Sequence, residues 1–420
     1  MDIQELLRGK EDCACGRPHR CPIEAVSVGA GVIAELDSLA EQDARVLLVA
    51  DENTYTAAGA QVEAALGARV GARVIFPGKP LLIPDERAIA RVRASLAGIT
   101  LVVGIGSGVI QDLCKYVSFF EKIPYVIVAT APSMDGYASS GAAMILSGMK
   151  ETVAVGLPRA IVLDTNVLKN APMDMIRSGY GDIIGKYSSL CDWHLGRAVD
   201  GEYYCPFIDR VIRDTVEEVR ASAAGLLCRE EKAIEALSRA LVVVGITLAF
   251  VGNSRPASGS EHHLSHFFEI VGIERGEDYL PHGTDVAYAA VVTSRLREEL
   301  CARAWPKGIF RPAREEFLSE MDAQYGRVAA GCVALQDKVG NYEKDRAPVY
   351  LAKEKELRAI LSEMPSSAEM EELLSEIGFR MPDFYAFYGE EKIKNAIRYA
   401  KDLKDRYTVL WMYYDLFGGE

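Results

Sequence analysis

Residues 101–112 read Leu101-Val102-Val103-Gly104-Ile105-Gly106-Ser107-Gly108-Val109-Ile110-Gln111-Asp112. An apolar strand here passes through three glycines into an apparent helix that continues to Phe119. Glycines let the backbone approach a phosphate closely, and the N–H groups at a helix N-terminus attract its negative charge. The stretch therefore predicts a loop that binds the pyrophosphate of a dinucleotide, although a structural turn would look similar. The predicted cofactor contacts are Gly106, Ser107, Gly108, Val109, Ile110 and Asp112.

Strand-like and helix-like segments alternate on both sides of this loop. The strand-like runs are Val46–Ala50, Arg73–Phe76, Thr100–Val103, Tyr125–Ala129 and Ile161–Leu163. With helical patterns such as Pro84–Ala97 between them, they indicate a parallel α/β sheet. From about Pro172 onward, apolar residues recur every three or four positions, which is typical of helices. We predict a Rossmann-like domain over residues 1–170 and an all-α domain over residues 171–420, with the ligand site between them.

A second loop follows the strand Tyr125–Ala129 and is rich in small and hydroxylated residues. Open α/β sheets bind ligands at the carboxyl ends of their strands, so this loop is a further candidate for cofactor contacts. A polar turn without a ligand is the alternative. The candidates are Thr130, Ala131, Pro132, Ser133 and Ser139. Asp51, which follows the strand Val46–Ala50, is a weaker candidate for the adenosine end of the cofactor.

Histidines cluster in the second half of the chain. Four of the six in the sequence fall within Glu261-His262-His263-Leu264-Ser265-His266 and Pro281-His282-Gly283. On a helix, His262 and His266 lie on one face, and His282 could return beside them. Asp182, in an apolar and glycine-lined helix start, is the best candidate for a carboxylate ligand. Two imidazoles and a carboxylate would leave open positions on a zinc, nickel or iron ion, as in a catalytic site.

Composition excludes several other functions. The net charge of −13 and the lack of a basic run with aromatic residues argue against nucleic acid as a partner. No secretory signal is recognisable and no apolar stretch approaches membrane-spanning length, so a cytoplasmic location and no membrane partner are expected. Nine cysteines, an odd number, do not indicate a disulfide framework. Cys13, Cys15, His19 and Cys21 could hold a structural zinc, or could simply belong to a surface loop.

These motifs, in this order, resemble those of the iron-containing alcohol dehydrogenase and dehydroquinate synthase superfamily. Within it, their wording is similar to that of the sn-glycerol-1-phosphate dehydrogenases, over about residues 25–300. The strings that carry the resemblance are Gly106-Ser107-Gly108, Thr130-Ala131-Pro132-Ser133-Met134-Asp135-Gly136, Gly181-Asp182 and Ser254-Arg255-Pro256-Ala257-Ser258-Gly259-Ser260-Glu261-His262-His263. Thr284 after His282-Gly283 modestly favours this branch, because many glycerol dehydrogenases and dehydroquinate synthases carry His-Gly-Glu there.

The resemblance implies reversible, NAD- or NADP-linked reduction of dihydroxyacetone phosphate, with one divalent metal ion and a homodimeric enzyme. It implies Asp182, His262 and His282 as metal ligands, with Asp135 and His266 contacting substrate. His266 is also a candidate in the proton relay, and Asp182 is also a candidate for contact with the substrate. Arg255 and Lys186 are candidates for the substrate phosphate, although Lys186 could instead be a solvated helix residue. The alternatives are a glycerol dehydrogenase, a dehydroquinate synthase-like lyase, or a silent metal- or nucleotide-binding scaffold.

Overall fold

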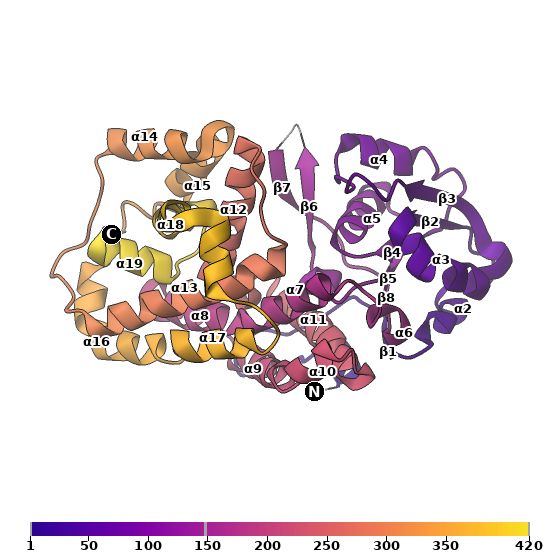
Figure 1. Cartoon of the computed structure of the whole chain (residues 1–420), viewed down its shortest axis with the longest axis horizontal. Helices are drawn as coiled ribbons and strands as arrows, with labels where there is room; N and C mark the ends of the chain where they lie inside the picture. Colours follow the sequence, from indigo (N-terminus) through magenta and orange to yellow (C-terminus); the bar gives the residue numbers. More distant parts are fainter. Residues whose placement is uncertain (1, 147–148, 419–420) are drawn as a thin grey trace. The chain divides into compact units, whose positions relative to one another are not determined.

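The computed structural model describes residues 2–146 and 149–418, which form two compact units (Figure 1). Unit 1 consists of Met1–Ile183 and Glu217–Ser254, and unit 2 consists of Ile184–Val216 and Arg255–Glu420. The chain therefore passes between the units three times. The predicted division into a Rossmann-like domain over residues 1–170 and an all-α domain over residues 171–420 stays a prediction.

Unit 1 is built on a parallel sheet whose strand order, in the described residues, is β1-β8-β5-β4-β2-β3. The five predicted strands are confirmed within a few residues at their ends. A sixth strand, β1, lies at the edge of the sheet and was not predicted. The strands are β1 (Ala25–Gly29), β2 (Val46–Asp51), β3 (Val70–Phe76), β4 (Leu101–Gly106), β5 (Tyr125–Ala129) and β8 (Ala160–Asp164).

Helices cover both faces of this sheet, and side-chain alternation along the strands decides which face each helix meets. Leu48 and Val103 join a buried cluster with Val62 of α3 (Glu52–Leu66). Gly104 faces the other way, because a Cβ there would lie 2.9 Å from Sγ of Cys114 on α5 (Gly108–Glu121). Apolar residues on both faces explain why the strands read as continuous hydrophobic runs.

The sheet reverses its winding between β2 and β4. β3 pairs with one side of β2, and the next strand, β4, pairs with the other side. Val49 aligns with Gly104, and the same offset places Asp51 level with Gly106, at the carboxyl ends of both strands. Such a reversal opens a crevice at the sheet edge that commonly binds nucleotides.

The rest of unit 1 consists of short elements around the sheet and one long helix. The antiparallel hairpin β6–β7, which the sequence analysis also missed, is separate from the main sheet. The remaining elements are α1 (Ile3–Leu7), η1 (Val32–Glu35), α2 (Leu36–Leu39), η2 (Gly67–Arg69), α4 (Glu86–Arg93), η3 (Asp135–Ala138), β6 (Gly141–Leu146), β7 (Met149–Ala154), α6 (Thr165–Leu168), α7 (Met173–Ile184), α10 (Ala223–Leu227) and α11 (Glu231–Val251).

Helix α11 corrects one expectation. Among the described residues it is the helix long and apolar enough to cross a membrane, so the prediction that no apolar stretch approaches that length is wrong. However, 72% of its most apolar window is buried. Gly245 in this helix meets η3 closely, since a Cβ there would lie 2.7 Å from the Cβ of Ala138. Its hydrophobicity therefore serves packing inside unit 1.

Unit 2 is helical throughout its described residues, as predicted. Its elements are α8 (Lys186–Asp200), η4 (Arg255–Ala257), α12 (Ser260–Arg275), α13 (His282–Ala302), α14 (Arg314–Tyr325), η5 (Gly326–Val328), α15 (Ala329–Val339), α16 (Ala347–Leu361), α17 (Ser367–Ser375), α18 (Met381–Tyr399), η6 (Ala400–Leu403) and α19 (Val409–Phe417). Helix α9 (Pro206–Arg220) continues from this unit into unit 1.

The buried carboxylate of Asp192 on α8 fixes the start of two helices in unit 2. One oxygen accepts the N–H of Ser260 at 2.6 Å, and the other accepts the N–H of Val409 at 2.8 Å. Arg297 on α13 donates to the same carboxylate at 2.9 Å. A fully paired buried charge of this kind holds α12, which carries three of the histidines, in a defined position.

Candidate active site

The glycine loop between β4 and α5 has two kinds of glycine. A Cβ at Gly106 would lie 2.5 Å from the Cβ of Ile110, so this glycine is required for the strand to meet the helix. A Cβ at Gly108 would meet only Cε of Met134, at 3.6 Å. The first turn of α5 has no acidic residue. Its first N–H groups have no partner within the helix and can bind a phosphate, as the sequence predicts.

The second loop is bonded directly to the glycine loop. The hydroxyls of Ser107 and Ser133 are 2.6 Å apart, and the N–H of Thr130 donates to the carbonyl of Gly106 at 3.1 Å. The buried hydroxyl of Tyr137 lies 2.7 Å from the carbonyl of Ala131, to which it donates, and 3.3 Å from Oγ of Ser107. The two predicted cofactor loops therefore form one hydrogen-bonded surface at the carboxyl edge of the sheet.

A buried lysine that was not predicted makes hydrogen bonds to the second of these loops. Nζ of Lys115 donates to the carbonyls of Gly136 at 3.1 Å and Gly141 at 2.7 Å, and pairs with Asp112 at 3.3 Å. Ser139, a predicted cofactor contact, lies 3.4 Å from the same Nζ. Burial lowers the pKa of Lys115, although the Asp112 carboxylate opposes this shift. Asp112 and Ser139 thus have structural contacts that the sequence did not indicate.

Asp51 also has a structural contact. One of its carboxylate oxygens accepts the N–H groups of Asn53 at 2.8 Å and Thr54 at 2.9 Å, which caps α3. The same residue stands at the carboxyl end of β2, beside the crevice. A capping aspartate is common at helix starts, so this contact explains Asp51 without any ligand. Its predicted contact with adenosine stays a prediction.

Helix α7 packs tightly against the second loop. A Cβ at Gly179 would lie 1.9 Å from the carbonyl oxygen of Pro132, so only glycine fits there. The hydroxyl of Ser178 donates to the carbonyl of Ser133 at 3.1 Å. The buried carboxylate of Asp182 accepts the N–H of Asp135 at 2.9 Å. Unit 1 therefore brings two predicted site residues, Asp135 and Asp182, into contact.

Unit 2 brings together three of the predicted histidines. The ring centroids of His262 and His282 are 5.0 Å apart, and the ligand nitrogens of these two residues lie within 4.8 Å of each other. The ring of His266 is 6.2 Å from that of His262 and 5.7 Å from that of His282. The prediction that the chain returns after the loop 272–281 to place His282 beside α12 is thus seen in unit 2.

The two closest histidines are each oriented through Nδ1. Oε1 of the fully buried Glu261 lies 2.8 Å from Nδ1 of His262 and also accepts the N–H of Gly259. Oγ of Ser265 lies 3.2 Å from Nδ1 of His282. An imidazole that donates from Nδ1 keeps the Nε2 lone pair for a metal ion, which is the arrangement of many metal-binding histidines. This donor chemistry fits a divalent transition metal.

His263, the fourth histidine of the cluster, has a different environment. It is fully buried, and neither ring nitrogen has a hydrogen-bond partner among the residues that the structure describes. Burial lowers the pKa of His263 well below its ordinary value, so the ring is neutral. It packs in the core of unit 2 rather than with the other three rings.

Both cations predicted to bind the substrate phosphate are buried. Lys186 is therefore not a solvated helix residue, and its Nζ donates to the carbonyl of Ala257 at 3.2 Å. Arg255 donates to both carboxylate oxygens of Glu202 at 2.7 and 2.9 Å. Arg255 also donates to the carbonyls of Asp192 and Tyr407, at 2.5 and 2.8 Å. These contacts make Arg255 a structural residue of unit 2 and a weaker phosphate candidate than Lys186.

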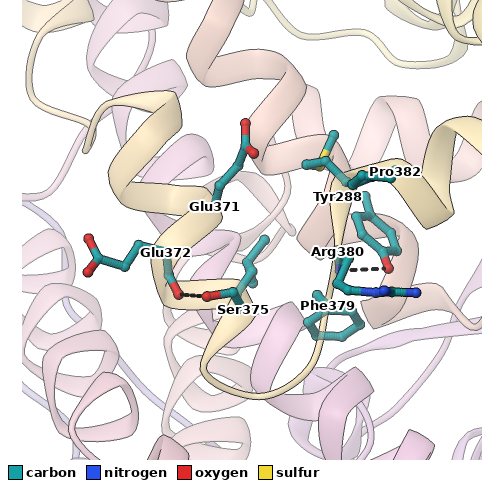
Figure 2. Close-up of a pocket in the computed structure, with 9 residues that line it drawn as sticks. Tyr288, Glu371, Glu372, Ser375, Phe379, Arg380 and Pro382 are labelled. Atoms are coloured by element: carbon teal, nitrogen blue, oxygen red, sulfur yellow. Dashed lines mark hydrogen bonds between the residues drawn. The ribbon is translucent and has the colours of Figure 1, made fainter.

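A pocket in unit 2 contains none of the predicted residues. It has a volume of about 480 Å³ and lies between α13, α17 and α18 (Figure 2). Within it, the N–H of Arg380 lies 3.4 Å from the hydroxyl of Tyr288, and Ser375 bonds a carbonyl of its own helix. Its lining residues form neither a phosphate-binding loop nor a cluster of metal ligands, so we assign it no function.

The sequence offered signals for some of the residues that it did not assign. Glu261 directly precedes His262 in the histidine-rich motif, and a metal-binding histidine commonly pairs with a carboxylate. Lys115 interrupts the apolar face of α5, where it follows Leu113 and Cys114. No local pattern marks Tyr137 or Ser265, because their contacts depend on how the loops fold.

The chain is similar to known proteins across nearly its whole length. A family model described as iron-containing alcohol dehydrogenase matches residues 25–172. A glycerol-1-phosphate dehydrogenase [NAD(P)+] of Bacillus subtilis is 30% identical over 377 residues, 87% of this chain and 84% of that protein. The protein of the same name from Bacillus velezensis is 34% identical over 285 residues, 66% of this chain and 72% of that protein.

A solved structure has the same fold. It is the iron-containing alcohol dehydrogenase of Thermococcus thioreducens, which has a TM-score of 0.59 at 15% identity and covers 90% of both chains. At this identity the likeness concerns the architecture alone. It confirms the predicted combination of a parallel α/β region followed by an all-helical region.

Proposed function

Since the chain belongs to the iron-containing alcohol dehydrogenase family and to its glycerol-1-phosphate dehydrogenase branch, we propose that it reduces dihydroxyacetone phosphate reversibly to sn-glycerol 1-phosphate. The reaction consumes NADH or NADPH and one proton. The observation that carries the proposal is the pair His262 and His282, each oriented through Nδ1 beside His266. The curated relatives do not favour the alternatives of a glycerol dehydrogenase or a lyase.

His262 and His282 would hold a divalent metal ion through Nε2, with Asp182 as the third ligand. Three observations on Asp182 support this role. It is buried, its carboxylate already accepts one N–H, and it lies one residue before Ile183, after which the chain enters unit 2. A buried carboxylate is costly unless charge or hydrogen bonds compensate it, and a metal ion would supply that compensation.

The dinucleotide would bind at the carboxyl edge of the sheet in unit 1. The first N–H groups of α5, at Gly108, Val109 and Ile110, would hold its pyrophosphate. The joined loop with Ser133 and Thr130 would contact the nicotinamide half. The lack of a side chain at Gly108, where a Cβ would lie 3.6 Å from Cε of Met134, fits a phosphate close to the backbone.

When bound, the nicotinamide supplies the hydride for the ketone carbon, and the divalent ion supplies the Lewis acid for its oxygen. Glu261 and Ser265 keep His262 and His282 in the orientation that leaves Nε2 available. His266, whose ring lies 5.7 Å from that of His282, would deliver a proton to the product oxygen. Asp135 would contact the substrate hydroxyl beside Asp182.

Lys186 is the proposed cation for the substrate phosphate. Its ammonium group is fully buried, carries a positive charge and donates to the carbonyl of Ala257. A site built for a phosphate dianion discriminates strongly against a ligand that lacks it, because a buried charge is then left unpaired.

The finer points are also part of this proposal. Zinc, nickel and iron all suit a site of two imidazoles and one carboxylate. We also propose a homodimer, which the family resemblance suggests, and the cytoplasmic location that was expected from the sequence. The same resemblance suggests a role in supplying the phosphoglycerol unit of phospholipids.

The decisive experiment measures nicotinamide absorbance with dihydroxyacetone phosphate and with dihydroxyacetone. Catalytic efficiency should be higher for the phosphate by more than roughly a thousandfold. The product should not react with an enzyme specific for sn-glycerol 3-phosphate. Equal rates with both ketones, or formation of the 3-phosphate, would contradict the proposed substrate while leaving a metal-dependent dehydrogenase.

A further inference from the structure

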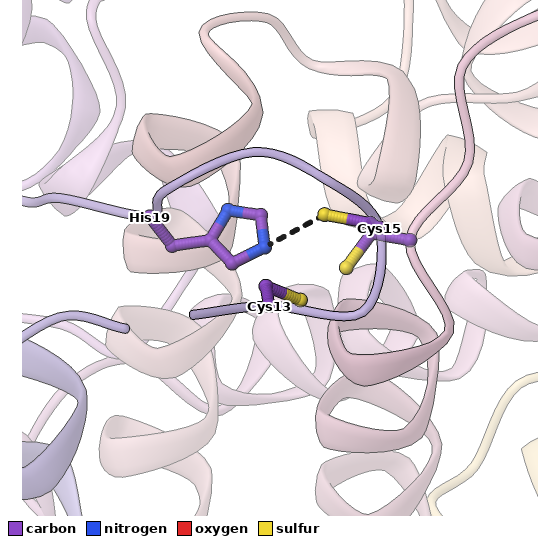
Figure 3. Close-up of side chains that lie close together, drawn as sticks. Cys13, Cys15 and His19 are labelled. Carbon is purple, nitrogen blue, oxygen red and sulfur yellow. Dashed lines mark hydrogen bonds between the residues drawn. The ribbon is translucent and has the colours of Figure 1, made fainter. Parts of the chain in front are cut away.

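The N-terminal segment brings together three soft metal ligands that the catalytic proposal does not use. The ligand atoms of Cys13, Cys15 and His19 lie within 4.8 Å of one another. Sγ of Cys15 is 3.4 Å from Nε2 of His19 (Figure 3). All three side chains project from one short loop toward a common point. Cys21, which the sequence also suggested, does not belong to this group.

The backbone holds this loop closed. The N–H groups of Lys10 and His19 donate to each other's carbonyls at 2.9 and 2.8 Å, in an antiparallel bridge. Between them, Gly16 adopts a φ of +80° and its N–H donates to the carbonyl of Cys13 at 2.9 Å. Gly9, with a φ of +76°, lets the bridge form, since a Cβ there would lie 2.5 Å from the carbonyl oxygen of His19. The loop therefore presents its thiols and imidazole in a fixed geometry.

The imidazole is also anchored to the core of unit 1. His19 is fully buried, and its ring stacks on that of Phe250 in α11, with centroids 5.4 Å apart and planes at 27°. The half-buried thiols of Cys13 and Cys15 leave the group accessible to an ion.

We propose that Cys13, Cys15 and His19 bind a structural Zn²⁺ ion, with a fourth donor completing the tetrahedron. Two thiolates and an imidazole are a typical zinc ligand set. They differ from the imidazole and carboxylate set proposed for catalysis, so the two sites have different metal preferences. The ion would connect the loop that carries the two cysteines to α11. His19 would bind the ion, and its ring stacks on a residue of that helix.

Metal analysis of the purified, reduced full chain tests this proposal. The protein produced with zinc should contain about two ions per chain, and the Cys13→Ser/Cys15→Ser variant should contain about one. The His282→Ala variant should lose the other ion and keep the cysteine-bound one. Cys228→Ser, which changes an exposed cysteine, is the matched control, and Cys21→Ser tests the residue outside the group. Neither should change the metal content.

Cobalt substitution gives a readout that does not depend on activity or on the fate of a variant. Cobalt-loaded wild-type protein should show a sulfur-to-cobalt charge-transfer band and the intense visible bands of a tetrahedral site. X-ray absorption at the zinc edge of the wild-type protein should show sulfur neighbours at about 2.3 Å. Absence of sulfur ligands in both spectra would overturn the proposal. So would a Cys13–Cys15 disulfide in protein kept under reducing conditions.

Discussion

Nδ1 of His262 lies 2.8 Å from Oε1 of Glu261, the residue that precedes it in the sequence. The carboxylate reaches back over the first turn of α12, where it also accepts the N–H of Gly259 at 2.9 Å. Burial alone would raise the pKa of Glu261, but the hydrogen bonds from His262 and Gly259 bring it below its ordinary value. The carboxylate is therefore ionised and favours the tautomer with the proton on Nδ1, in which Nε2 has the lone pair that a metal ion would bind.

Replacing this carboxylate by an amide should weaken metal binding. Glu261→Gln keeps the volume but removes the charge that fixes the tautomer of His262, so metal affinity should fall roughly 10- to 100-fold. Competition with a chelator measures this, and excess metal should restore part of kcat. Glu274→Gln, on the same helix but paired with the exposed Arg327, is the control and should behave like the wild type. Unchanged affinity in Glu261→Gln would show that the tautomer is set by other contacts.

The three clustered histidines should separate into ligands and a proton donor. His262→Ala and His282→Ala should lose the metal bound at this site and nearly all activity, because each removes a ligand. His266→Asn should retain the metal while kcat falls by about 100-fold or more, as expected for loss of a general acid. Metal content and steady-state kinetics on the same preparations make the distinction. Metal loss in His266→Asn would make it a ligand instead.

The two glycines of the cofactor loop should respond differently to a methyl group. Gly106→Ala places a Cβ against Ile110 and should lower the melting temperature as well as cofactor affinity. Gly108→Ala has room for its Cβ and should fold normally. Alanine keeps the backbone N–H, but its methyl group would hold the phosphate away from it, and loss of one hydrogen bond to a charged phosphate, about 1.5–3 kcal/mol, would weaken binding roughly tenfold or more. Nicotinamide fluorescence measures the affinity, and unchanged binding in Gly108→Ala would place the pyrophosphate elsewhere.

Lys186→Met should reduce recognition of the phosphate. Methionine fills a similar volume in the buried site, while the ammonium group is lost. Catalytic efficiency with dihydroxyacetone phosphate should fall about 10- to 100-fold, and the slow rate with dihydroxyacetone should change little. If both substrates lose efficiency equally, Lys186 supports the fold through Ala257 rather than binding phosphate.

Lys115→Met should destabilise unit 1, although Lys115 is not proposed to contact the cofactor, the metal ion or the substrate. It would leave the carbonyls of Gly136 and Gly141 without their buried donor, at a cost of about 1–3 kcal/mol in the free energy of unfolding. Denaturant unfolding measures this, with the exposed Lys232→Met as the control. A variant as stable as the wild type would show that other groups can satisfy these carbonyls.

Local patterns predicted the architecture well because the buried strands read as continuous apolar runs and the helices repeat their apolar residues every three or four positions. Tyr125–Ala129 has the same bounds in the structure as in the prediction. The edge strand β1 was missed because Ser27 and Gly29 break its apolar run. The hairpin β6–β7 gave no comparable signal in the sequence analysis.

The site was predictable where chemistry is concentrated in few residues, and less so where it depends on distant contacts. The clustering of four histidines in the sequence predicted a common site, and unit 2 brings three of them together. Arg255 was a candidate for the phosphate because a guanidinium group can bind an anion through two parallel hydrogen bonds. Its pairing with Glu202, fifty-three residues earlier, has no local trace in the sequence. Lys115 was overlooked for a similar reason, since the carbonyls of Gly136 and Gly141, to which it donates, lie on other elements.

The contact between Gly179 and Pro132 has a consequence for the order of events in catalysis. With no gap between helix and loop, residues 130–139 cannot shift without displacing α7, and with it Asp182. A dinucleotide bound at this loop, as proposed, would therefore also fix the position of the Asp182 carboxylate. We expect, on that basis, that the coenzyme binds before the ketone.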